Sequence, residues 1–300
     1  MIYFVILLVA IIILSSLIIT LAIYHMQFGK RIDCKIYDSK NDFVNEKKMI
    51  FQSGQNRLTG WLYYPKANQI QKDRIILFIH GYGVTHKNYM LEIYELVYRG
   101  YIVFSYDMTG CGESEGDKIK GFSQFVIDAQ AAIQFLKANF KEDIMIMGHS
   151  TGGYAAGAVL NIEADNLCQA IIISGFNNPS EFIRICMQKK MKCYAYLLKI
   201  WIEVFERKQF KKYASLTAIT GIQNFQKPVL VLQGDKDNEV ELGASLYQQK
   251  GSIANNKVFF QLVKNAGHFL TRKDEKTISN SVFNLIEEFI TQDNRFKAEG

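Results

Sequence analysis

Short apolar runs alternate with segments of helical periodicity along most of the chain. Runs that are apolar throughout are typical of strands buried on both faces of a sheet. We expect such strands at 74–80, 101–107, 143–149, 168–174, 228–234 and 257–263. Helices are expected between or after them, at about 87–99, 122–139, 151–162 and 276–291. This alternation predicts an α/β fold with a mostly parallel central sheet and helices on both faces.

Two segments depart from this alternation. Residues 47–53 and 57–64 have the pattern of a hairpin that turns around Gly54, Gln55 and Asn56. Residues 176–224 are helix-like and show no strand pattern. We therefore expect them to form a helical cap inserted into the α/β scaffold.

The N-terminus is apolar for longer than any element of a small domain requires. Residues 2–24 carry no charge, and Ser15, Ser16 and Thr20 alone interrupt the apolar run. At about 1.5 Å per residue such a helix reaches about 34 Å, enough to cross a hydrocarbon core of about 30 Å. A signal peptide would have a basic start, a shorter apolar run and a small-residue cleavage site. A buried core helix would not be apolar on every face.

These features predict three parts. A transmembrane anchor is expected at 1–25, a polar linker at 26–46, and an α/β domain at 47–300 that includes the cap. Lys30 and Arg31 are the basic residues nearest the apolar run, and they follow it. The positive-inside rule therefore places the α/β domain on the cytoplasmic side of a single-pass membrane protein.

Composition narrows the classes of function. The 300 residues suffice for one large domain or two small ones, and the net charge of +6 does not indicate nucleic-acid binding. The five cysteines are odd in number and have no C-x-x-C spacing. Neither a disulfide framework nor a zinc site is predicted, and a reducing environment is favoured.

The segment 148–152 reads G-x-S-x-G, with Ser150 at its centre. A predicted strand precedes it and a predicted helix follows, which is the setting of a nucleophile elbow. Strand and helix nearly touch at such a turn, so Gly148 and Gly152 satisfy the need for very small residues. The helix N-terminus also favours a developing negative charge beside Ser150. Ser150 is the predicted nucleophile.

A serine nucleophile needs a base, and the chain has five histidines. His268 directly follows the last predicted strand, at the same sheet edge as Ser150, and is the predicted base. The others are placed less well: His25 at the membrane boundary, His80 at a strand end, His86 in an unconstrained loop, and His149 inside the elbow, pointing away from Ser150.

The base in turn needs a carboxylate to orient it. The loop after the strand at 228–234 offers Asp235, Asp237 and Glu239. The residues themselves leave these three open. The resulting order of serine, acid and histidine along the chain is one of several known for such triads.

Over about residues 47–292 the chain resembles the α/β-hydrolase superfamily, and within it the monoacylglycerol lipase and serine aminopeptidase-like esterases. The resemblance rests on motifs in the family's order: HGYG (80–83), DMTGCGES (107–114), GHSTGG (148–153), GDKDNEV (234–240) and AGHF (266–269). The family pattern G-x-x-D-x-x-V implies Asp237 as the acid. The family's oxyanion donors correspond to the backbone N–H groups of Tyr82 and Thr151.

One motif departs from the family. Relatives usually have Arg or His at the position of Thr109. That loop supports the nucleophile structurally, so the change bears on local stability more than on chemistry. Asp107, in the same motif, is interpreted as a carboxylate that caps a turn rather than as a metal ligand or second acid.

The cap is strongly basic. Residues 181–212 hold nine Lys or Arg and three Glu, a net charge of +6 that equals that of the whole chain. Large apolar residues lie between the basic ones, a composition suited to an anionic bilayer surface and an acyl-chain substrate. The simpler interpretation is that the apolar residues pack on the core while the lysines stay in water.

The sequence thus predicts a membrane-anchored serine hydrolase with the α/β-hydrolase fold. Its expected substrate is a carboxylic ester with an apolar acyl part, such as a monoacylglycerol or lysophospholipid, and it should need neither a metal nor an organic cofactor. A serine peptidase or amidase with the same triad is the alternative within this chemistry. A catalytically silent, membrane-tethered binding module is the alternative outside it. The sequence predicts no nucleic-acid partner and does not specify an oligomeric state.

Overall fold

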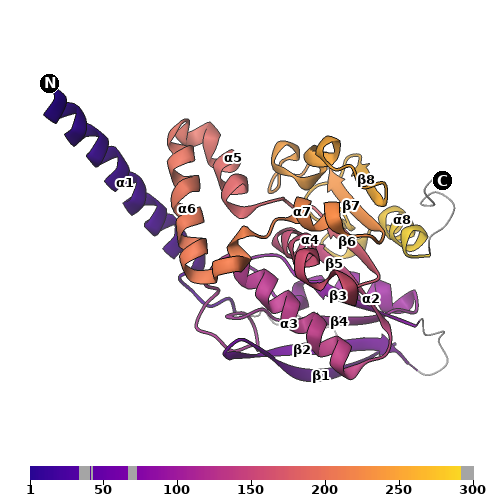
Figure 1. Cartoon of the computed structure of the whole chain (residues 1–300). Helices are drawn as coiled ribbons and strands as arrows, with labels where there is room; N and C mark the ends of the chain where they lie inside the picture. The colour runs from indigo at the N-terminus through magenta and orange to yellow at the C-terminus, as the bar shows by residue number, and fades with distance from the viewer. Residues whose placement is uncertain (34–40, 42, 67–72, 292–300) are drawn as a thin grey trace.

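The computed structural model describes residues 1–33, 41, 43–66 and 73–291. An eight-stranded sheet with the order β1-β2-β4-β3-β5-β6-β7-β8 forms its centre (Figure 1). The strands are β1 (Val44–Ser53), β2 (Asn56–Pro65), β3 (Arg74–Ile79), β4 (Ile102–Tyr106), β5 (Asp143–His149), β6 (Gln169–Ile173), β7 (Val229–Gly234) and β8 (Val258–Val263). Neighbours from β4 to β8 pair in parallel, whereas β2 is antiparallel to both β1 and β4. The predicted mostly parallel sheet is confirmed.

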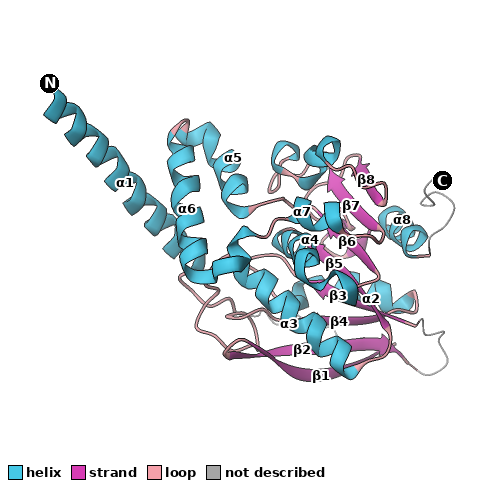
Figure 2. Ribbon diagram, in the orientation of Figure 1, coloured by secondary structure: helices cyan, strands magenta, loops and turns pink. Residues whose placement is uncertain are grey.

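The helices fall where the apolar periodicity predicts them, with small shifts at the ends (Figure 2). They are α1 (Ile2–Phe28), α2 (Met90–Tyr98), α3 (Ser123–Asn139), α4 (Thr151–Glu163), α5 (Pro179–Met191), α6 (Tyr194–Phe210), α7 (Ala218–Asn224) and α8 (Asn280–Ile290). Short 3-10 turns lie at His86–Tyr89, Ala164–Asn166, Lys211–Ser215, Leu242–Ala244 and Leu246–Ser252.

The last helix differs from the expectation of 276–291. It starts at Asn280 because Thr277–Ile278 forms β10, which pairs with β9 (Arg272–Asp274) in a small separate hairpin. A two-residue strand is too short to show periodicity, so the sequence pattern did not separate it from the helix that follows.

Alternate residues of the buried strands face two different helical layers. On β3, Ile75, Leu77 and Ile79 belong to the core shared with α3, α4 and α7. Ile76 and Phe78 belong to the opposite core, shared with α2 and α8. A strand that must be apolar on both faces reads as an unbroken hydrophobic run, which is why the sequence pattern identified it.

The predicted insertion, 176–224, forms the cap. It consists of α5, α6 and α7 joined by loops and contains no strand, and all its residues are described. Helices α5 and α6 form an antiparallel pair that stands away from the sheet (Figure 1). Helix α6 packs along the N-terminal helix, so the cap stands beside α1 (Figure 1).

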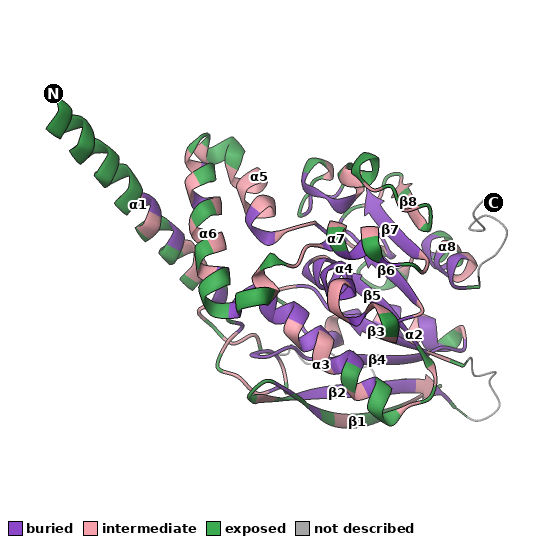
Figure 3. Cartoon of the chain, viewed as in Figure 1, coloured by how far each residue is buried: buried purple, intermediate pink, exposed green. Residues whose placement is uncertain are grey.

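Helix α1 projects from the body of the protein, and most of its length is exposed (Figure 3). By length and apolar composition it is a candidate membrane span. Its last turns pack against the domain, where Phe28 is only 3% exposed. The helix thus extends past residue 25, the expected end of the anchor. Residues 34–40 and 42 of the expected linker, including Cys34, and 292–300 of the expected domain lie outside the described residues.

Candidate active site

Ser150 occupies the sharp turn between β5 and α4. Its φ of 58° lies in the left-handed region that a serine rarely adopts, and its backbone N–H donates to the Ile173 carbonyl at 2.9 Å. A Cβ on Gly148 would lie 2.1 Å from the Gly152 carbonyl oxygen, and one on Gly152 would lie 2.3 Å from the Ile79 carbonyl oxygen. Only glycine fits at both positions, so the packing of strand against helix requires the G-x-S-x-G spacing.

His268 and Asp237 meet at the same sheet edge, on the loops after β8 and β7. The Nδ1 of His268 lies 2.9 Å from the Oδ2 of Asp237, and both residues are buried. The other oxygen of Asp237 accepts the backbone N–H groups of Glu239 and Val240 at 2.9 and 2.8 Å. Burial acts to raise the pKa of Asp237, but the hydrogen bond and charge of His268 and these N–H groups hold it below its usual value. Asp235, in contrast, is exposed.

The structure brings a second carboxylate to His268. The Nε2 of His268 lies 3.5 Å from Oε2 of Glu239, whose side chain is 69% exposed. Ser150 and His268 share no hydrogen bond, and no described residue bonds to the Ser150 hydroxyl. Sequence reasoning offered Glu239 only as a candidate orienting acid; its position on the opposite side of the imidazole from Asp237 depends on the loop's conformation.

Two backbone N–H groups beside Ser150 lack acceptors. Those of Tyr82 and Thr151 donate to nothing among the residues that the structure describes. Thr151 begins α4, where the first N–H groups of the helix point outward. The loop that carries Tyr82 passes close by, since a Cβ on Gly81 would lie 3.3 Å from that of Ser150. An oxyanion formed at Ser150 could therefore accept both N–H groups.

A buried chain of hydrogen bonds links this loop to His268. The Gly81 N–H donates to the Tyr89 hydroxyl at 3.1 Å, and that hydroxyl lies 2.7 Å from Nδ1 of His149. The Nε2 of His149 lies 3.0 Å from the carbonyl oxygen of His268. Burial lowers the pKa of His149 to about 3, so the ring is neutral and can donate through Nε2 while accepting through Nδ1. Sequence reasoning placed His149 facing away from Ser150 but did not find this connection.

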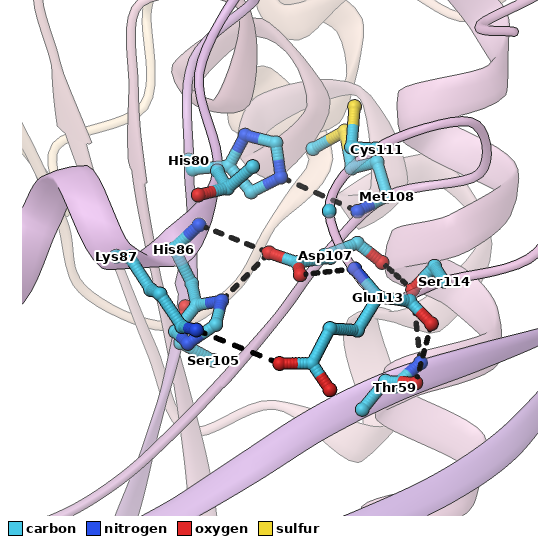
Figure 4. Close-up of polar contacts among 12 residues, drawn as sticks. Thr59, His80, His86, Lys87, Ser105, Asp107, Met108, Cys111, Glu113 and Ser114 are labelled. Atoms are coloured by element: carbon cyan, nitrogen blue, oxygen red, sulfur yellow. Dashed lines mark hydrogen bonds and ion pairs between the residues drawn. The ribbon is translucent and has the colours of Figure 1, made fainter. Parts of the chain in front are cut away.

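Asp107 holds the loops around the elbow together (Figure 4). One of its oxygens accepts the backbone N–H of His86 at 3.2 Å and contacts Nδ1 of the same residue at 2.6 Å. The other accepts the Glu113 N–H at 2.9 Å. His86, expected in an unconstrained loop, is instead fully buried. Nearby, the Met108 N–H donates to Nε2 of His80 at 3.3 Å, and Nδ1 of His80 bonds to the Gly81 carbonyl at 2.7 Å.

Thr109 is accommodated by a buried carboxylate. Its N–H and hydroxyl donate to Asp128 at 2.8 and 3.0 Å, and Ser53 and Gln124 donate to the same group. Burial raises the pKa of Asp128, although these donors oppose the shift. Thr109 is thus fully satisfied in the position where relatives usually carry Arg or His.

The buried histidines predict a loss of stability in mild acid. Burial lowers the pKa of His80 to about 4 and that of His149 to about 3. Both remain neutral in the fold, whereas the unfolded chain binds their protons below about pH 6.5. The free energy of unfolding is therefore at its full value above about pH 6.5. It falls as the pH drops toward the pKa values of the folded state, by at most about 1.4 kcal/mol per histidine and pH unit.

Thermal unfolding of the full chain in detergent micelles should accordingly show a lower midpoint at about pH 5 than at about pH 7.5. His149→Asn should reduce this difference, because it removes one of the two groups. An identical midpoint at both pH values would contradict the neutral, buried state of these rings.

A cavity of about 260 Å³ opens beside Ser150. Apolar side chains from the cap, from α1 and from the loops at the sheet edge make up much of its lining. Its lining residues are Thr20, Ile23, Tyr24, Gln27, Phe28, Tyr82, Phe122, Ser150, Thr151, Phe176, Phe182, Ile183, Cys186, Met187, Ile202, Glu239 and Val240. Among the described residues no group of three His, Cys, Asp or Glu side chains could hold a metal ion.

Known proteins share this architecture. An esterase of Pyrococcus furiosus superposes with a TM-score of 0.64 and 20% identity, over 87% of this chain and 98% of its own. The ferulic acid-bound protein Est1E of Butyrivibrio proteoclasticus gives 0.60 and 18%, over 81% and 99%. An acylaminoacyl peptidase of Pyrococcus horikoshii gives 0.61 and 19%, over 86% of this chain and 43% of its own. At these identities the likeness concerns the fold.

The family assignment comes from the sequence. None of the curated proteins shows significant similarity to the chain. The family model described as serine aminopeptidase, S33, matches residues 70–220, half of the chain. That match spans the loop that carries Tyr82, the turn at Ser150 and most of the residues 176–224. The chain therefore belongs to the S33 serine aminopeptidase family of α/β-hydrolases.

Proposed function

We propose that this protein is a membrane-anchored serine hydrolase that cleaves carboxylic esters through Ser150, His268 and Asp237. One observation carries the proposal: a histidine bonded to a buried aspartate shares a sheet edge with a serine held at a φ of 58°. Such an arrangement converts a weakly nucleophilic hydroxyl into an attacking group. The membership of a serine hydrolase family supports the same chemistry.

In the proposed reaction, the Ser150 hydroxyl attacks the ester carbonyl while Nε2 of His268 takes its proton. Asp237 keeps the Nδ1 proton of His268 in place and stabilises the imidazolium. The N–H groups of Tyr82 and Thr151 donate hydrogen bonds to the oxyanion. Each such donor typically raises the rate about a hundredfold or more. The imidazolium protonates the leaving alkoxide, and water then hydrolyses the acyl-enzyme by the same steps. This chemistry requires neither a metal nor an organic cofactor.

Before attack, Glu239 must leave Nε2 of His268, which now faces its carboxylate at 3.5 Å. The Glu239 side chain is mostly exposed, so turning into water costs it little. Substrate in the cavity would occupy the space between this side chain and Ser150.

The lining of the cavity favours an ester with an apolar acyl part, such as a monoacylglycerol or a lysophospholipid. Phe176, Phe182, Ile183, Met187 and Ile202 line it from the cap side. Glu239 is the charged residue among those that line the cavity. This is the pattern of a site that binds an aliphatic chain and fixes one polar centre.

The packing of α1 supports an anchor over a cleaved signal peptide. Phe28 contacts Tyr82 and Phe122 edge-on at ring distances of 5.6 and 4.9 Å. Cleavage near residue 25 would remove Tyr24, whose ring packs on Phe28 at 4.7 Å, and with it the part of the cavity lining formed by Thr20, Ile23 and Tyr24. The orientation, with the domain in the cytoplasm, remains a prediction from Lys30 and Arg31. An impermeant thiol reagent should then reach exposed Cys193 only after the cells are lysed; labelling in intact cells would reverse the orientation.

The second candidate function is hydrolysis of a peptide or amide with a free amino group. Glu239 is the carboxylate that lines the cavity, and a carboxylate there could bind an ammonium group. The basic cap opposes this interpretation, since Lys and Arg repel a cationic substrate.

The two functions are separated by comparing p-nitrophenyl esters, from acetate to palmitate, with aminoacyl anilides on the full chain in detergent micelles. We expect the butyrate or a longer ester to exceed every anilide in kcat/KM by about a hundredfold or more. The Glu239→Gln variant should keep its ester activity. If the anilides are preferred and Glu239→Gln loses them selectively, the amidase function replaces the esterase.

A further inference from the structure

Helix α1 contributes part of the cavity beside Ser150. We call Thr20, Ile23, Tyr24, Gln27 and Phe28 the α1 wall, because all five line that cavity. They follow one another on one side of the helix, from Gln27, close to the sheet edge, to Thr20, farther out. Along the axis this separation is about 10 Å at 1.5 Å per residue.

The wall is fixed to the domain at its lower end. The Tyr82 hydroxyl donates to the Gln27 carbonyl, and the Tyr24 hydroxyl donates to Glu206 of α6 at 2.5 Å. Glu206 is buried and also accepts the Phe122 and Ser123 N–H groups, at 2.9 and 3.0 Å, where α3 begins. A buried carboxylate thus ties α1, α3 and α6 at one point.

The chain directly after α1 is also held. The guanidinium of Arg31 donates to the carbonyls of Gly112, Ser114 and Gly116 at 2.5 to 2.7 Å. Ile32 forms a parallel bridge with Cys111. Helix α1 therefore has a defined orientation over the active site rather than a loose tether.

Higher up, α1 is bonded to the cap. The Trp201 indole N–H donates to Ser16 at 2.9 Å, and the hydroxyls of Ser15 and Tyr194 lie 2.6 Å apart. Ser16 and Thr20 are buried, whereas the apolar side chains of Leu14, Ile18 and Leu21 nearby are exposed. Polar residues that bond across helices are typical of packing inside a bilayer. Helix α6 accordingly reaches the level of the apolar run.

The outer face of α6 is apolar at that level. Tyr196, Ile200 and Val204, spaced four residues apart, are 51, 53 and 45% exposed. The neighbouring helix α1 is likewise exposed and apolar along most of its length (Figure 3). A soluble domain gains nothing from such a stripe, but a lipid bilayer that already surrounds α1 would cover it.

We propose that α1 is a wall of the acyl-binding site as well as an anchor, and that lipid substrate reaches Ser150 from the bilayer between α1 and the cap. The proposal rests on the proposed esterase function. The ester group lies at Ser150, and the acyl chain runs along Ile23 toward Thr20 and the membrane. Residues of the α1 wall therefore set the length of chain that is accepted.

Ile23 offers the sharpest test, because it lines the cavity midway along the wall. In Ile23→Trp the larger side chain should fill the acyl path. We expect kcat/KM for p-nitrophenyl laurate to fall at least about tenfold more than kcat/KM for the acetate ester. Leu21→Trp, on the outward face of the same turn and 50% exposed, is the matched control and should retain the wild-type ratio.

The route of access is tested with the full chain in phosphatidylcholine vesicles mixed with protein-free ones. A palmitate ester placed in the protein-bearing vesicles should be hydrolysed at least about tenfold faster than one placed in the others. Equal rates would overturn access from the bilayer. Equal ratios of kcat/KM for laurate and acetate in Ile23→Trp, Leu21→Trp and wild type would overturn the proposal that α1 forms a wall of the acyl-binding site.

Labelling by a fluorophosphonate probe keeps these failures distinct from failure of the proposed function. If all the variants and wild type label and hydrolyse acetate ester while the chain-length profile is unchanged, only the role of α1 fails. If wild type neither labels nor hydrolyses any ester, the proposed function and this inference both fail.

Discussion

Replacing Ser150 by alanine is expected to lower kcat for ester hydrolysis about 10⁶-fold, to the level that the oxyanion donors and substrate binding alone provide. The hydroxyl is the proposed attacking group, and it lies on the residue that directly precedes the unbonded N–H of Thr151. Alanine keeps the backbone of the elbow, although its φ of 58° stays unfavourable for any residue with a Cβ.

The measurement is steady-state hydrolysis of p-nitrophenyl butyrate by the full chain in micelles. Ser215→Ala, at an exposed position of the cap, is the matched control and should change kcat by less than about twofold. Hydrolysis by Ser150→Ala at a rate near that of the control would exclude Ser150 as the nucleophile.

Asp237→Asn should reduce kcat by about 10⁴-fold. Oδ2 of Asp237 accepts from both His268 Nδ1 and Gln233 Nε2, at 2.9 and 3.0 Å. Oδ1 accepts two backbone N–H groups. Because both oxygens of Asp237 face donors, the amide nitrogen of an asparagine would face a donor in either orientation. The imidazole would then turn to the tautomer that carries its proton on Nε2, which cannot take a proton from Ser150.

Asp235→Asn is the matched control, because Asp235 is exposed and two residues away. We expect it to hydrolyse p-nitrophenyl butyrate within about twofold of wild type. If Asp235→Asn or Glu239→Gln loses as much activity as Asp237→Asn, the orienting acid has been assigned to the wrong side chain.

Local periodicity was sufficient to predict the sheet and most helices. Strands such as β3 and β7 are buried on both faces. Their sequences are therefore nearly continuous apolar runs of strand length. Local periodicity does not predict the order of strands in the sheet, because β2 pairs with β4 although β3 and α2 lie between them in the sequence.

The site was predictable only in part. Ser150 and His268 follow strands at one sheet edge, so the position of each in the sequence already placed them together. The choice of Asp237 among three acids depended on the family pattern, since all three occupy one short loop. The distance of 3.5 Å between Glu239 and His268, and the chain from Gly81 through Tyr89 to His149, are long-range contacts that no local pattern encodes.

The sequence of α1 indicates which face of the helix packs on the domain, although its apolar composition makes this hard to see. Ser16, Thr20, Tyr24 and Phe28 recur every four residues, and so lie on one face of the helix. That face is the one that packs on α6 and the cavity. Ser15 and Ser16, two of the three polar residues that interrupt the apolar run, bond to Tyr194 and Trp201 of the cap, and only the tertiary structure shows these partners.

The proposed triad is tested most directly by labelling with a fluorophosphonate probe, followed by mass spectrometry of the modified peptide. We expect a single phosphonyl adduct on Ser150 of the full chain, lost in Ser150→Ala and strongly reduced in His268→Ala. Wild-type protein that takes up no probe, or Ser150→Ala that labels as wild type does, would contradict the proposed triad.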